Sequence, residues 1–273
     1  MVCVTEQVDV ILLTKNSLKP CLKECVDSVY AQLPVGRLIV VDGNSTDGTV
    51  DFVKSYPRVE VIDDKNGNRA TARQKGIEAV RTTWHLHLDS DVILCNGWWS
   101  AAQKFLRPDV GAIWGVTIPG DRHVYNITKS MAMLYRKNVL DYIITQQHLK
   151  RYLTHDTLIR TDVVRGIHIP EDLHIWEDHY IGQYIVTKNF KWLTTRDPCC
   201  IHLFHERRGF EDFVNSGRLA RRVRSYSSRQ ILLRLGLAVP KSLWILLVTA
   251  DFKAAKLQLE NYIGLTKGWF GSA

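Results

Sequence analysis

The sequence predicts an α/β fold with a mostly parallel sheet flanked by helices and followed by a helical, basic, amphipathic extension. Apolar runs alternate with helically spaced segments up to about residue 118, and an acidic or polar residue closes each run. The last quarter of the chain carries nearly all of the net positive charge. Because buried parallel strands read as continuous apolar runs, the alternation indicates βαβ units.

The first strand is expected at residues 8–14, where the run VDVILLT is almost entirely apolar. Residues 17–32 follow, with leucine, cysteine and valine at helical spacing. A second strand is expected at 37–42 (RLIVVD). Residues 45–56 then begin with Ser, Thr and Asp, which are typical capping residues, so a short helix is expected there.

The third strand is expected at 59–63 (VEVID), a helix at 70–81 (ATARQKGIEAVR), and the fourth strand at 84–89 (WHLHLD). Strands and helices that alternate at this interval predict a parallel sheet with both faces covered. The carboxyl ends of its strands would meet at one edge, where ligands bind in open α/β sheets.

The composition is that of a folded protein with a substantial core. Of the 273 residues, 45% are hydrophobic and 10% aromatic, which suits one large domain or one domain with an appendage. The N-terminus has an acidic residue before its apolar run and no basic segment, so we expect no signal peptide and a cytoplasmic protein. The six cysteines lack zinc-ligand spacing and are expected to be reduced packing residues.

Polar side chains follow all four expected strands, and the strand order should bring them to one edge of the sheet. Asp89 and Asp91 repel each other, so a shared Mg²⁺ or Mn²⁺ would stabilise the pair. The alternative is a solvated turn, because Asp-Ser-Asp is also common turn chemistry. The strand-end residues are Thr14, Lys15, Asn16, Asp42, Asp63, Asp64, Asp89 and Asp91.

Three motifs occur in an order that resembles the family 2 glycosyltransferases of the GT-A (Rossmann-like) fold. They are VVDGNSTDGT at 40–49, NGNRATARQKGI at 66–77 and DSD at 89–91. The resemblance covers residues 7–118 well and continues more weakly to about residue 205. It implies a catalytic domain at 1–205, with nucleotide-sugar binding at 7–118 and acceptor binding at 119–205.

The resemblance also implies roles for the strand-end residues. Asp91 is expected to bind the metal directly, and Asp89 to contact the metal through water or the ribose. Arg73 is expected near the diphosphate. Asp63 or Asp64 would touch the base or lie in an exposed turn. The residues expected to line the nucleotide-sugar pocket are Thr14, Lys15, Asn16, Asp42, Asp64, Arg73, Asp89 and Ser90.

A second acidic region supplies the candidate general base. The stretch HIPEDLHIWEDHYIGQYIV contains two Glu-Asp pairs, and the second opens an expected helix. By resemblance, Asp178 is the base that deprotonates the acceptor and Glu177 supports it or binds the acceptor. Acids at a helix start also complement the helix dipole, which is the alternative. Glu171 and Asp172 form the fallback pair.

Histidines after the last expected strand, 191–197, are candidate metal ligands. Some GT-A enzymes complete the metal shell with a histidine in this region, and imidazole suits Mn²⁺. His202 and His205 are equivalent candidates on the sequence alone. Trp98 and Trp99 follow the DSD motif and are either an acceptor-sugar platform or core residues.

Residues 206–273 form a distinct basic tail. They hold 12 Lys or Arg and 5 Asp or Glu, a balance of +7 out of a total of +8. Their longest uncharged apolar run, 243–250, is too short to span a bilayer. The tail is expected either to lie on an anionic membrane, which would make the protein peripheral on the inner face, or to be an ordinary helical cap.

The resemblance implies a metal-dependent, inverting glycosyltransferase that uses a nucleotide diphosphate sugar. GDP-mannose and UDP-glucose are the first donors to test, although no residue selects between them. The acceptor is expected to be a hydroxyl of a glycan or lipid-linked saccharide, and the alternative acceptor is polyprenyl phosphate. A second alternative is a non-catalytic module that binds a nucleotide or nucleic acid. Because the chain lacks the interleaved basic and aromatic motifs of RNA-binding folds, no nucleic-acid partner is expected.

Overall fold

The computed structural model describes residues 7–149, 152–203 and 209–271. Its internal contacts divide the chain into two compact units. Unit 1 comprises Met1–Ile118 with Tyr152–His202, and unit 2 comprises Pro119–Arg151 with Leu203–Ala273. Residues 119–149, which we expected in the acceptor part of the catalytic domain, belong to the unit that contains the C-terminal helices.

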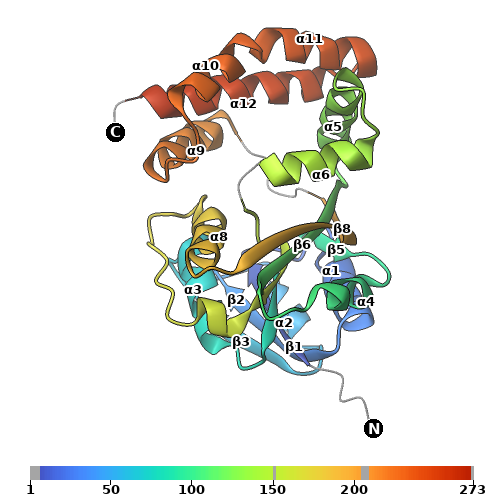
Figure 1. Ribbon diagram of the computed structural model, residues 1–273. Helices are drawn as coiled ribbons and strands as arrows, with labels where there is room; N and C mark the ends of the chain where they lie inside the picture. Colours follow the sequence, from blue (N-terminus) through green and yellow to red (C-terminus); the bar gives the residue numbers. More distant parts are fainter. Residues whose placement is uncertain (1–6, 150–151, 204–208, 272–273) are drawn as a thin grey trace. The chain divides into compact units, whose positions relative to one another are not determined.

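Unit 1 contains an eight-stranded sheet in the order β3-β2-β1-β4-β7-β6-β8-β5 (Figure 1). β1 pairs in parallel with β2 and β4, and β2 pairs in parallel with β3. β7 runs antiparallel to β4 and β6, and β5 runs antiparallel to β8. The strands are β1 (Val8–Thr14), β2 (Val35–Asp42), β3 (Val59–Asp63), β4 (Trp84–Asp89), β5 (Val92–Leu94), β6 (Val110–Pro119), β7 (Asp156–Arg160) and β8 (Lys191–His202).

Helices cover both faces of this sheet, which confirms the predicted α/β class. Successive residues of β1 point to opposite faces, so Leu12 packs into one core and Ile11 into the other. α1 and α4 lie over the first face, and α3 and α8 over the second (Figure 1). The helices of this unit are α1 (Leu22–Gln32), α2 (Thr49–Val53), α3 (Arg69–Ala79), α4 (Trp98–Ala102), the 3₁₀ turn η1 (Gln103–Phe105), α7 (Thr161–Val164) and α8 (Glu177–Thr187).

Several predicted boundaries differ from the structure, and the two largest differences are of five residues each. The expected helix at 17–32 begins only at Leu22, because the backbone amides of Ser17 and Leu18 bind side chains of the loop after β2 instead. The last strand continues to His202 rather than ending at residue 197, because its final residues pair with β5. Trp98 and Trp99 are buried in the core under the sheet, which settles their role in favour of packing.

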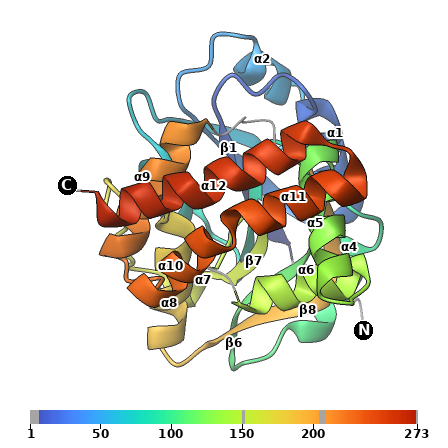
Figure 2. The same cartoon turned by 90° about the horizontal axis from the view of Figure 1, so that it is seen from above.

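Unit 2 consists of helices, as expected for the tail. α12 contacts α5, α9, α10 and α11, and Figure 2 shows α11 running beside it. Gly217 and Gly268 allow α9 and α12 to approach closely, since neither has a Cβ. A Cβ at Gly268 would collide with the carbonyl oxygen of Val214, and one at Gly217 with that of Leu265. The helices are α5 (Arg122–Leu134), α6 (Val139–Leu149), α9 (Phe210–Arg222), α10 (Ser228–Gly236), α11 (Ala238–Thr249) and α12 (Phe252–Phe270).

Candidate active site

Two carboxylates and an imidazole meet at the edge of the sheet in unit 1. One ligand atom from each of Asp89, Asp91 and His202 lies within 4.8 Å of the others. His202 Nε2 is 3.2 Å from Asp91 Oδ1. The pairing of β5 with β8 sets Val92 opposite His202, and this register brings the turn that carries Asp91 to the end of β8.

This donor set fits a divalent cation. Carboxylate oxygens suit both Mg²⁺ and Mn²⁺, and an imidazole nitrogen favours Mn²⁺ of the two. Of the two histidines that the sequence left equivalent, the structure brings His202 to the carboxylates. His205 lies outside the described residues.

Asp89 also receives a buried guanidinium. Arg73 NH2 donates to Asp89 Oδ1 at 2.6 Å, and the Arg73 side chain is almost completely buried. Burial would raise the pKa of Asp89, but the charge of Arg73, helped by His155 and His202, outweighs it and lowers the pKa to about 2. Asp89 is therefore an anion at any working pH, as a metal ligand must be.

A chain of buried polar groups orients Arg73. Arg73 NH1 lies 3.3 Å from His87 Nδ1, His87 Nε2 lies 3.1 Å from His85 Nε2, and His85 Nδ1 lies 2.8 Å from Thr161 Oγ1. A guanidinium only donates, so His87 Nδ1 accepts, His87 Nε2 donates to His85, and His85 Nδ1 donates to the threonine. One neutral tautomer of each ring satisfies the whole chain.

Burial keeps these histidines neutral. It lowers the pKa of His85 to about 3, and burial together with the Arg73 charge lowers the pKa of His87 well below its usual range. The sequence did not single out either residue, since in WHLHLD they read as ordinary alternating positions of a strand. Their partners, Arg73 and Thr161, come from other elements of the fold.

We expect the protein to lose stability below about pH 6.5. An unfolded His85 gains a proton there and the folded one does not, so the free energy of unfolding falls by about 1.4 kcal/mol per pH unit for each such histidine. Urea unfolding between pH 4 and 8 measures the slope. His85→Gln should reduce the slope by the share of one histidine. Equal slopes in the parent protein and the variant would contradict the assignment.

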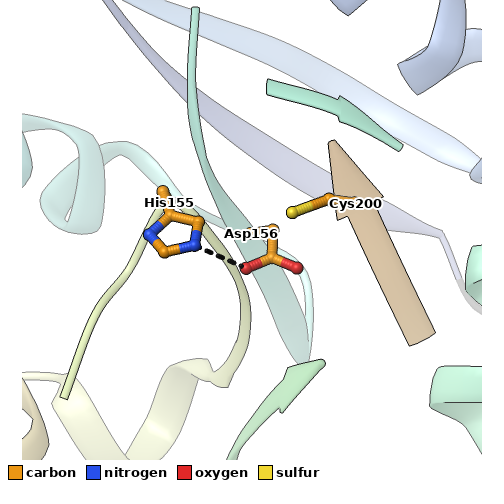
Figure 3. A group of neighbouring side chains, drawn as sticks. All are labelled: His155, Asp156 and Cys200. Atoms are coloured by element: carbon orange, nitrogen blue, oxygen red, sulfur yellow. Dashed lines mark ion pairs between the residues drawn. The ribbon is translucent and has the colours of Figure 1, made fainter. Parts of the chain in front are cut away.

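A second polar cluster lies behind His202. Figure 3 shows the side chains of His155, Asp156 and Cys200 turned toward one another, with His155 Nε2 3.4 Å from Asp156 Oδ1. The His155 ring lies 4.9 Å from the His202 ring, and the His155 carbonyl accepts the backbone amide of Asp89. Burial raises the pKa of Asp156 to about 7. His155 thus contacts His202 and Asp89, two of the three residues of the candidate cation site.

Asp42 organises the loop at the end of β2. Its carboxylate accepts the Thr14 hydroxyl at 2.7 Å and both the amide and the hydroxyl of Ser45 at 2.7 and 2.6 Å. Asp42 also lines a hollow of about 410 Å³, together with Asp63, residues of the loop after β2 and the first turn of α2. The buried Asp42 therefore fixes the shape of this hollow as well as facing it.

The other strand-end residues lie around the same loops. Asn16 is exposed, and its side-chain oxygen accepts the amide of Thr46 at 2.8 Å. Lys15 is exposed, and its side chain lies against Gly43. The Ser90 hydroxyl donates to the Ser17 hydroxyl at 2.9 Å.

Asp64 lies apart from the hollow. It is buried, and its carboxylate accepts the Thr71 hydroxyl and pairs with Lys75 Nζ, both at 2.9 Å. These contacts tie the turn after β3 to the first turns of α3. A contact between Asp64 and the base stays a prediction.

Glu177 and Asp178 open α8, and both side chains are buried. Asp178 Oδ1 accepts the backbone amide of His179 at 2.7 Å. The loop that leads into α8 is bound to α3, because Asn68 Nδ2 donates to the Glu171 carbonyl at 2.8 Å. α3 also carries Arg73, so the same helix supports both the carboxylate edge and the segment before Asp178.

The sequence matches the model of a protein family named Glycosyl transferase family 2 over residues 9–168. A curated relative, the uncharacterized glycosyltransferase EpsJ of Bacillus subtilis (strain 168), is 31% identical over 86 residues. That alignment covers 30% of this chain and 25% of EpsJ, so the chain matches about a quarter of the relative's length.

Solved structures share the fold. The mannosyltransferase PcManGT from Pyrobaculum calidifontis, in complex with GDP-Man and Mn²⁺, superposes with a TM-score of 0.64 at 15% identity, covering 99% of this chain and 89% of PcManGT. TarS 1–349 of S. aureus in complex with UDP gives a TM-score of 0.57 at 16% identity, covering 96% of this chain and 90% of that one. The complex of TarS 1–349 with UDP-GlcNAc gives 0.53 at 17% identity, covering 96% and 73%.

Proposed function

Because the chain belongs to glycosyl transferase family 2, we propose that it is a metal-dependent, inverting glycosyltransferase that uses a nucleotide diphosphate sugar. The observation that carries the proposal is the cluster of Asp89, Asp91 and His202 at the same sheet edge as the hollow beside Asp42. One part of this edge suits a diphosphate-bound cation and the other a nucleoside. A binding module without catalysis would leave the carboxylates at the start of α8 with a structural role alone.

The hollow beside Asp42 is the proposed nucleoside pocket. Thr14 and Asn16, at the end of β1, hydrogen-bond to its lining residues Asp42 and Thr46, and Lys15 lies between them in the chain. Arg73 is proposed to supply the positive charge near the diphosphate. The proposed donors are GDP-mannose and UDP-glucose. The GDP-Man bound to PcManGT, whose fold this chain shares, favours testing GDP-mannose first.

Asp91 and His202 are the proposed direct ligands of Mn²⁺ or Mg²⁺, and Asp89 the ligand that acts directly or through water. The bound cation would neutralise charge that develops on the leaving diphosphate. Arg73 fixes the orientation of Asp89 through the 2.6 Å hydrogen bond, and the buried histidines fix Arg73. The chain thus presents its ligands already oriented, which reduces the reorganisation needed in the reaction.

Asp178 is the proposed general base. It takes the proton of the acceptor hydroxyl as that oxygen forms its bond to the anomeric carbon. The bond from the anomeric carbon to the phosphate oxygen breaks at the same time, and the nucleoside diphosphate leaves with the electron pair. Attack from the side opposite the leaving group inverts the anomeric configuration.

The proposed acceptor is a hydroxyl of a glycan or lipid-linked saccharide. A polyprenyl phosphate is the second candidate, favoured by the basic residues of unit 2. The two differ in their need for a base, since a phosphate oxygen is already an anion. Asp178 therefore separates them.

A donor panel tests the proposed function. With Mn²⁺ present, the protein should release GDP from GDP-mannose or UDP from UDP-glucose slowly to water, and faster when a glycolipid acceptor is added. Product release is measured for these donors, GDP-glucose and UDP-GlcNAc. Donors that bind without any nucleoside diphosphate release would favour the non-catalytic binding module.

A further inference from the structure

Unit 2 exposes an apolar surface along two consecutive helices. Six large side chains of α10, α11 and the start of α12 are each more than half exposed, and Leu247 reaches 80%. Scattered exposed leucines are normal on a protein surface, but a continuous patch marks a binding surface. We call this set the apolar face: Leu232, Leu233, Val239, Leu243, Leu247 and Phe252.

The same helices are held to the rest of the unit by their opposite side. Ile231, Ala238 and Ile245 are buried, and both α10 and α11 contact α12. The two helices lie beside α12 in both views (Figures 1 and 2). Each helix therefore has an inner apolar stripe that packs within the unit and an outer one that does not.

The geometry favours a segment lying flat rather than one crossing a bilayer. In the part of the chain that the structure describes, no single helix is long and apolar enough to span a membrane. α10 and α11 pass that test only as a pair, and they are bent by 45° at the break between them. The buried Ile231 and Ile245 tie both halves to α12, so the pair presents one side outward.

The charges around the apolar face are all positive on these two helices. α10 and α11 contain Arg229, Arg234 and Lys241 and no acidic residue, and Lys253 follows at the start of α12. Arg229 also borders a shallow depression of about 540 Å³ together with Leu232 and Leu233. Arginine beside exposed leucine suits an anionic headgroup above an acyl chain.

Trp244 points into unit 2, whereas a tryptophan of a membrane-surface helix commonly lies at the lipid headgroups. Trp244 donates its indole N–H to the carbonyl of Ser130 at 2.8 Å and packs with Met131 and Ile245. It therefore anchors α11 to α5. The outward contact is left to the leucines and Phe252.

We propose that the apolar face is a membrane-docking surface that lies in the headgroup region of an anionic bilayer. The six apolar side chains enter the boundary of the acyl chains, and Arg229 and Lys253 remain at the level of the lipid phosphates. This binding does not depend on the transferase reaction. It would bring the enzyme to the surface where a lipid-linked acceptor resides.

Vesicle co-sedimentation of the full chain tests the proposal. The protein should sediment with vesicles of phosphatidylglycerol and phosphatidylcholine at low salt, and less at high salt or with phosphatidylcholine alone. Leu243→Ser with Leu247→Ser should weaken binding by about tenfold or more, since both side chains lose acyl contact. Ile263→Ser, a partly exposed position outside the face, is the matched control.

The contribution of the positive charges is tested with Arg229→Gln and Lys253→Gln in the same co-sedimentation experiment. Each should weaken binding to anionic vesicles by about fivefold and leave binding to neutral vesicles unchanged. Circular dichroism and donor binding verify that the variants are folded.

Two results would overturn the proposal. One is sedimentation with anionic vesicles that the leucine variants do not reduce. The other is a dimer in light scattering that Leu243→Ser with Leu247→Ser dissociates, without vesicle binding by the parent protein. The second result would assign the face to a second copy of this chain.

Discussion

Replacing Asp91 by asparagine is expected to reduce glycosyl transfer by about 10³-fold or more. The variant keeps the size of the side chain but removes the charge that, with His202 and Asp89, forms the proposed cation site. A bound divalent cation contributes several kcal/mol to stabilising charge on a leaving group, and about 4 kcal/mol corresponds to that factor. Excess EDTA should have the same effect on the parent protein.

The readout beyond activity is Mn²⁺ affinity, measured by titration calorimetry or by electron paramagnetic resonance with GDP present. Asp91→Asn should lose most of it, and His202→Gln should weaken it without destroying the fold. Asp109→Asn is the control, because that exposed aspartate pairs with Lys191 away from the cluster. Undiminished transfer in EDTA would remove the metal from the proposed function and leave Asp91 a turn residue.

The parallel half of the sheet could be predicted from the sequence because its strands are apolar runs. β1, β3 and β4 have the predicted boundaries; β1 and β4 are buried, and the edge strand β3 is partly buried against the two cores. The antiparallel half gave no such signal. β5 has only three residues, and its pairing with β8 depends on a segment about a hundred residues later.

The site follows the same division. The residues at the strand ends could be found because parallel topology alone brings them together. The residues that support the site could not be found, because their roles depend on contacts between segments that are distant in the sequence. His87 orients Arg73 from the middle of a strand, and His155 lies against His202 from the start of another. A buried histidine in sequence looks like any half-polar strand position until its partner is known.

For Arg73, the sequence predicts one role and the structure shows another. Its place in the third helix, within a motif of the family, suggested a diphosphate contact. In the structure the guanidinium is almost wholly buried and donates one hydrogen bond to Asp89 and one to His87. Arg73 therefore keeps the Asp89 carboxylate ionised and fixes its orientation.

Asp178→Asn is expected to lower kcat by about 10²-fold or more, with donor affinity nearly unchanged. A positioned base contributes a factor of that order when the acceptor is a hydroxyl. Asp178 lies at the start of α8 and does not line the proposed nucleoside pocket, so the donor is expected to lose no direct contact. Calorimetric donor titration and steady-state kinetics on the same preparation separate the two quantities.

The change also distinguishes the acceptors. A hydroxyl acceptor must lose its proton, so the loss of Asp178 should reduce turnover and flatten the rise of kcat with pH that a carboxylate base produces. A polyprenyl phosphate needs no base, and its transfer should fall much less. Glu171→Gln and Asp172→Asn provide the comparison, since that pair is the other acidic candidate before α8. If those variants lose turnover while Asp178→Asn retains it, the base belongs to the earlier pair. If donor affinity collapses together with turnover in Asp178→Asn, the buried carboxylate instead holds the start of α8 in place.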